Sequence, residues 1–139
     1  MRPTPALSPG DGLAKLATYP YSVLTWVEPT GYPVSVAVDV EFDAATGTVR
    51  FERPAGLAVP LDREISLTGS HIRPQPGYGY DERRHVTVWG HAQPAEGDRL
   101  AVTPSSAWGW DEAEVPFFEY SERSIGKARR YFDALSRER

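Results

Sequence analysis

Three histidines are the residues that could bind a metal ion or a haem. His71, His85 and His91 lie in two neighbouring stretches that are predicted below as strands. The sequence contains no helical His-x-x-x-His pair, and no carboxylates gather beside these histidines. We therefore expect no metal site, and we expect surface or hydrogen-bonded histidines instead. Haem binding through His71 or His91 is a further alternative.

The sequence offers no constellation for nucleophilic catalysis. Cysteine is absent, which excludes a thiolate nucleophile, a disulfide and a cysteine metal site. Ser70 stands beside His71, but neighbours on a strand point to opposite faces, and no Gly-x-Ser-x-Gly segment occurs. The Gly77-Tyr-Gly79 segment lacks the strand–turn–helix context of a nucleotide fingerprint. No catalytic side chain is assigned for these reasons.

Charge and hydropathy exclude two classes of partner. The 139 residues include 15 basic and 19 acidic ones, for a net charge of −4, and the basic residues are scattered. A nucleic-acid groove needs a concentrated basic face, so we expect no nucleic-acid partner. No apolar run approaches the roughly 20 residues of a membrane helix, so we expect no membrane partner. Residues 1–139 are predicted to form a single domain of a cytoplasmic protein.

The element that must organise the chain is the strictly alternating stretch 32–42. One face carries Val34, Val36, Val38, Val40 and Phe42, and the other carries Ser35, Ala37, Asp39 and Glu41. This period of two predicts a strand. Turn residues at 29–31 and 43–47 join it to predicted strands at 21–28 and 48–53. Two successive antiparallel hairpins with one apolar face must be buried against more sheet or a helix.

Three more strands and two helices are predicted around this meander. The strands are expected at 64–73, 84–93 and 98–103, with a loop at 74–81. Ser8 and Pro9 predict the start of a short helix that buries Leu13, Leu16 and Ala17. A C-terminal helix is expected at about 122–137 after a Ser121 cap, with Ser124 as an alternative cap, and the barrel at about 20–104. The predicted class is therefore mainly β.

The order and spacing of three segments resemble the pyridoxamine 5'-phosphate oxidase-like, flavin-binding split-barrel superfamily. The segments are Leu24-Thr-Trp-Val-Glu-Pro-Thr-Gly-Tyr-Pro-Val-Ser-Val, Leu61-Asp-Arg-Glu-Ile-Ser-Leu67 and Val86-Thr-Val-Trp-Gly-His-Ala92. The likeness spans roughly residues 13–102. It implies a six-stranded antiparallel Greek-key split barrel that forms a homodimer. It also implies FMN, or a deazaflavin, held at the subunit interface for oxidoreductase chemistry on an unknown substrate.

The same resemblance suggests four cofactor-binding residues. It implies that Ser35 lies where a flavin ring approaches, that Arg53 and Arg63 hold the phosphate, and that Trp110 caps the ring. Each residue also has a simpler interpretation. Ser35 would then lie on a half-exposed strand face, the arginines would pair with nearby acids, and Trp110 would close the end of the barrel.

A second function follows from the stretch after the third predicted strand. Superfamily members that bind FMN usually place a Thr or Ser there, followed by a Lys or Arg. Here residues 51–61 contain no lysine and place Glu52 beside Arg53. The alternative hypothesis is therefore a cofactor-free, dimeric split barrel that acts as a binding or interaction protein.

Overall fold

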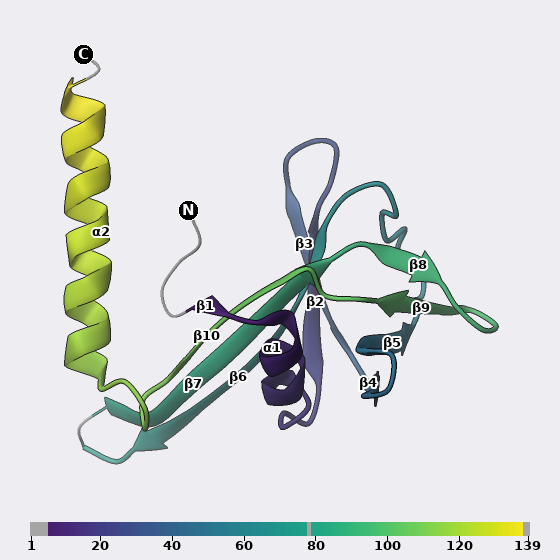
Figure 1. Ribbon diagram of the computed structural model, residues 1–139, viewed down its shortest axis with the longest axis horizontal. Helices are drawn as coiled ribbons and strands as arrows, with labels where there is room; N and C mark the ends of the chain where they lie inside the picture. Colours follow the sequence, from purple (N-terminus) through teal and green to yellow (C-terminus); the bar gives the residue numbers. More distant parts are fainter. Residues whose placement is uncertain (1–5, 78, 138–139) are drawn as a thin grey trace.

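The computed structural model describes residues 6–77 and 79–137 (Figure 1). In this described part, ten strands and two helices follow one another along the chain. They are β1 (Ala6–Leu7), α1 (Pro9–Leu16), β2 (Ser22–Val27), β3 (Pro33–Val38), β4 (Val40–Asp43), β5 (Thr48–Glu52), β6 (Ile65–Gln75), β7 (Gly79–Gly90), β8 (Ala92–Pro94), β9 (Arg99–Val102), β10 (Ser106–Asp111) and α2 (Phe117–Arg137).

Two antiparallel sheets share strands that bend from one sheet into the other. The larger sheet has the order β1-β10-β7-β6-β2-β3, and the smaller has the order β4-β5-β9-β8. A single residue joins β3 to β4 at Asp39 and β7 to β8 at His91, and residues 103–105 join β9 to β10. When each bent pair is taken as one strand, six strands close a ring in the order β2, β3–β4, β5, β9–β10, β7–β8, β6. The predicted six-stranded antiparallel barrel is confirmed.

The barrel interior is filled by the apolar faces of the alternating strands. Trp26 and Phe51 are 2% and 1% exposed and are among the largest buried side chains. β2 pairs with β3 so that Thr25 lies opposite Ser35 and Trp26 opposite Val34. A sheet with this period places the hydroxyl residues on the outside. The small, polar outer face of β3 predicted from the sequence is therefore present.

Helix α1 packs against β7 and β10 and begins as predicted. The Ser8 hydroxyl accepts a hydrogen bond from the Asp11 backbone N–H at 3.1 Å. Leu13 and Leu16 are buried as expected. The prediction for Ala17 is wrong, because the helix ends at Leu16 and Ala17, its C-cap residue, is exposed.

The stretch predicted as a loop at 74–81 is instead the end of a long β-hairpin. β6 and β7 remain paired as far as Gln75 and Gly79. The Arg73 guanidinium donates two hydrogen bonds of 2.8 Å to the Asp81 carboxylate across this hairpin. The prediction failed because proline and glycine usually end strands. Here the ion pair between Arg73 and Asp81 and the backbone pairing of β6 with β7 keep this segment within the sheet.

Helix α2 begins five residues earlier than predicted, at Phe117, and ends at Arg137 as expected. Figure 1 shows α2 standing apart from the barrel and rising from the end of the β6–β7 hairpin. Only its first turn packs closely, where Phe117 and Tyr120 contact Trp110. None of the described helices is both long enough and apolar enough to cross a membrane.

Candidate functional site

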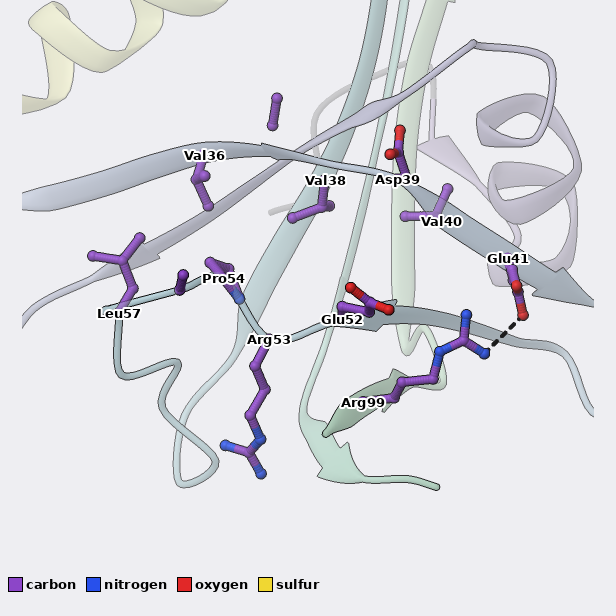
Figure 2. A pocket seen from close by; sticks show the side chains of 12 residues that line it. Val36, Val38, Asp39, Val40, Glu41, Glu52, Arg53, Pro54, Leu57 and Arg99 are labelled. Atoms are coloured by element: carbon purple, nitrogen blue, oxygen red, sulfur yellow. Dashed lines mark hydrogen bonds and ion pairs between the residues drawn. The ribbon is translucent and has the colours of Figure 1, made fainter. Parts of the chain in front are cut away.

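A groove of about 510 Å³ lies between the β3–β4 strand and the segment that follows β5. Val36 and Val38 line one side of it, and Pro54 and Leu57 line the other (Figure 2). Pro54 follows the end of β5, and its lack of an N–H prevents the ladder from continuing. The volume falls within the roughly 300–1,000 Å³ of small-molecule sites. This groove is therefore our candidate functional site.

Charged residues cluster at the β4–β5 end of the groove. Three carboxylates and two guanidinium groups line it, from Asp39, Glu41, Glu52, Arg53 and Arg99. An Arg99 Nη1–H donates to Glu41 Oε2 at 2.9 Å, which joins residues 58 positions apart in sequence. This hydrogen bond lowers the pKa of Glu41 and raises that of Arg99. Arg99 is therefore already paired with the Glu41 carboxylate.

Arg53 is the cation most available to a ligand. Its Nε lies 3.4 Å from Asp98 Oδ1, and the Asp98 side chain is 87% exposed. Exposed ion pairs of this kind contribute about 0–1 kcal/mol, so a ligand anion can replace Asp98. Figure 2 shows the Arg53 side chain extending away from Val36 and Val38. A rotation about its side-chain bonds is needed to bring the guanidinium toward the apolar wall.

The other three predicted cofactor residues do not line this groove. The Ser35 hydroxyl is 2.9 Å from the Thr25 hydroxyl on the outer face of β2 and β3. Arg63 Nη1 donates to the Val27 carbonyl oxygen at 3.1 Å. The Trp110 indole donates to the Val115 carbonyl oxygen at 2.8 Å, beside the start of α2. The structure therefore brings Arg53 together with Ala37, but not with Ser35, Arg63 or Trp110.

The three histidines lie in different surroundings. His71 Nε2 is 3.2 Å from Glu82 Oε2, and His91 is exposed. The His85 ring lies 4.5 Å from the Trp108 ring, and burial lowers its pKa. Among the described residues, no three His, Cys, Asp or Glu side chains are grouped to hold a metal ion.

Sequence reasoning did not identify Glu41, Asp39 and Arg99 as groove residues. A signal for the two acids was present, because they continue the outward-facing alternation of Ser35 and Ala37 toward the third strand. No comparable signal existed for Arg99. Its place beside Glu41 depends on the pairing of β5 with β9, which joins strands far apart in the sequence.

Two solved structures share this fold at low sequence identity. The FAD binding protein from Mycobacterium smegmatis matches with a TM-score of 0.56 and 11% identity, over 76% of this chain and 97% of that one. A protein from Corynebacterium glutamicum assigned as a pyridoxamine 5'-phosphate oxidase matches with a TM-score of 0.53 and 10% identity, over 78% and 99%. No family model and no curated protein sequence matches the chain.

Proposed function

We propose that this chain, which has the split-barrel fold of pyridoxamine 5'-phosphate oxidase-like proteins, is a cytoplasmic homodimer that binds FMN or a deazaflavin. The observation that supports this function is the groove of about 510 Å³ beside β3, where the resemblance expects a flavin. The two solved structures are described as an FAD binding protein and as a pyridoxamine 5'-phosphate oxidase, which favours the same cofactor class. The reaction class is an oxidoreductase step, and no substrate is assigned.

The proposed roles follow from the side chains beside the groove. Val36 and Val38 would contact a flat ring, whereas Ala37 and Ser35 lie on the opposite, outer face of β3, where the contact of Ser35 with the ring stays a prediction. Arg53 would bind the flavin phosphate by exchanging Asp98 for it. Arg63 would supply a second cation, and Trp110 would cap the ring from the second subunit. When bound, the flavin supplies hydride chemistry and the protein supplies orientation and electrostatics.

The groove fits a flavin ring better than it fits a flavin phosphate. Its valine and proline side chains provide an apolar wall, which suits a planar aromatic system. Asp39 and Glu52 line the same groove and repel a phosphate, while Arg99 is held by Glu41. Among the arginines that line the groove, Arg53 is therefore expected to make the main contribution to FMN retention, with Arg63 outside the groove as the second cation.

The test is the visible absorption spectrum of the freshly purified protein, before and after addition of excess FMN and desalting. We expect a retained flavin band, and we expect Arg53→Glu to abolish it. Arg137→Glu changes the net charge equally at the far end of α2, away from the groove, and should keep the band. A flavin affinity of Arg53→Glu equal to that of the unmodified protein would overturn the phosphate assignment. Absence of any band with FMN or with a deazaflavin would overturn the function.

The second candidate function is a cofactor-free, dimeric binding or interaction protein. The observation that favours it is the excess of acids in the groove, with Asp39, Glu41 and Glu52 against Arg53 and Arg99. A colourless protein that stays dimeric and binds neither FMN nor a deazaflavin would identify this function. The same spectra, combined with a mass measurement, therefore discriminate between the two candidates.

A further inference from the structure

The apolar side chains of α2 form an exposed stripe. Phe118, Ile125 and Phe132 stand seven residues apart and are 82%, 53% and 63% exposed. Ser121, Ala128 and Leu135 fall between them, so the alternating spacings of three and four are those of a heptad repeat. This is the narrow stripe of a helix that packs on another helix. The barrel does not cover this stripe, because its three large side chains remain exposed.

A helix in this position needs a partner surface. Beyond its first turn, α2 makes few contacts with the rest of the chain, as Figure 1 shows. In proteins most of the stability of a helix comes from tertiary packing of its amphipathic face rather than from helix propensity. The helix also contains Gly126, which is unfavourable in a helix interior. Packing of the exposed stripe would supply the stability that the barrel does not.

We propose that α2 pairs in an antiparallel orientation with α2 of a second copy of the chain. In that alignment Phe118 of one copy faces Leu135 of the other, Ile125 faces Ala128, and Phe132 faces Ser121. Each layer then combines a larger side chain with a smaller one, which fills the seam evenly. In a parallel pair each residue would face the same residue of the other copy. Phe118 would then meet Phe118 and Phe132 would meet Phe132, which crowds those layers, while the layers of Ser121 and Ala128 would be underfilled.

Charge complementarity identifies the second copy as the occupant. Glu122 and Arg129 border the stripe on the same side and are exposed. Neither side chain forms an ion pair with another residue in the described part of the chain. In the antiparallel alignment, Glu122 of each copy faces Arg129 of the other, which gives two equivalent ion pairs about a two-fold axis. In a parallel pair the same groups would lie about 10 Å apart along the axis.

The α2 pairing and the proposed flavin-binding function have one requirement in common, which is that two copies of the chain associate. Flavin is not needed for it, because none of the stripe residues lines the groove. Absorbance reports on the cofactor, and covalent cross-linking reports on α2. The two proposals can therefore fail separately.

Cysteine cross-linking tests the orientation directly, because the natural chain has no cysteine. We expect Phe118→Cys/Leu135→Cys to form a disulfide-linked dimer on mild oxidation, seen on a non-reducing gel. Phe118→Cys alone should stay unlinked, because its two copies would be about 25 Å apart in the antiparallel pair. Failure of the double variant to cross-link would overturn the proposal. Efficient cross-linking of Phe118→Cys alone would overturn it as well, in favour of a parallel pair.

Charge reversal tests the ion pairs. Glu122→Arg and Arg129→Glu should each weaken α2 association, and an equimolar mixture of the two variants should restore it, because every facing pair is again of opposite sign. The readout is the yield of the Phe118→Cys/Leu135→Cys disulfide in each background. Arg130→Glu changes the charge on the far side of the helix and should leave the yield unchanged. Equal yields in all backgrounds, with no recovery in the mixture, would overturn the antiparallel register.

Discussion

The Trp110 ring of β10 is stacked on the Tyr120 ring of α2, with centroids 4.4 Å apart and planes 19° apart. The Trp110 N–H also donates to the Val115 carbonyl oxygen, in the turn that leads into the helix. Within one subunit, Trp110 therefore anchors the start of its own C-terminal helix. Its role as a cap over a flavin in the second subunit stays a prediction, and any such role must leave this contact intact or replace it.

Removal of this contact should loosen the base of α2. Tyr120→Ala deletes a stacked aromatic pair worth about 0.5–1.5 kcal/mol beyond its buried area. We expect limited proteolysis within α2 to become about two- to tenfold faster, because local opening of the helix becomes easier. Tyr120→Phe keeps the ring and should be cleaved at the rate of the unmodified protein. Equal rates for Tyr120→Ala and Tyr120→Phe would mean that the stack does not hold the helix.

The barrel strands were predictable because their alternation is local. Val34, Val36 and Val38 repeat with period two between clear turn residues, and nothing distant is needed to read that pattern. The strand β10 was not predicted, because the sequence around Trp108 and Trp110 interleaves large side chains with Ala107 and Gly109. A Cβ at Gly109 would lie 3.0 Å from both the His85 carbonyl oxygen and Leu7 Cδ1. A pattern decided by such distant neighbours is not visible in one sequence.

The candidate groove was predictable only in part. Arg53 and the small outer face at Ala37 were found from their place beside predicted strands, and the structure brings both to one groove. Ser35 lies on the same strand face but hydrogen-bonds to Thr25 outside the groove. The ion pair of Arg99 with Glu41 depends on which strands become neighbours. Strand order is set by the whole core, so this part of the site could not be read from local spacing.

Gly12 should tolerate no side chain, although it lies in a helix. A Cβ at this position would collide with the Cβ of Ala107 and crowd Val88. Gly12→Ala is expected to lower the free energy of unfolding by about 1–3 kcal/mol, because overpacking outweighs the better helix propensity of alanine. In the same helix, a Cβ at Gly10 would meet nothing within 4 Å. Gly10→Ala should therefore be neutral or stabilising by up to about 1 kcal/mol. The measurement is urea denaturation of both variants, which gives their free energies of unfolding. Equal losses of that free energy in Gly12→Ala and Gly10→Ala would contradict the close packing of α1.

The tip of the β6–β7 hairpin should respond to acid through Asp81. Hydrogen bonds from Arg73 and then Gln75 lower the pKa of Asp81 from 3.8 to about 2. Because the folded pKa is depressed, the contribution of this carboxylate is present above pH 3.8 and is lost as pH falls toward 2. A carboxyl-carbon NMR titration should give a midpoint near 2. Arg73→Gln should raise that midpoint more than Gln75→Ala does, and the opposite order would assign the shift to the wrong partner.

Glu52 should oppose the phosphate of a bound flavin. It lines the same groove as Arg53 and carries a charge of the same sign as the phosphate. Glu52→Gln is therefore expected to tighten FMN binding about two- to fivefold at low salt, an effect that high salt should screen. Riboflavin has no phosphate, so its affinity should not change, and this difference separates electrostatic repulsion from a change in groove shape. Glu96→Gln removes an exposed acid outside the groove and serves as the control. If Glu52→Gln changed FMN and riboflavin binding equally, the phosphate would not lie beside Arg53, and the flavin would have to enter the groove in another orientation.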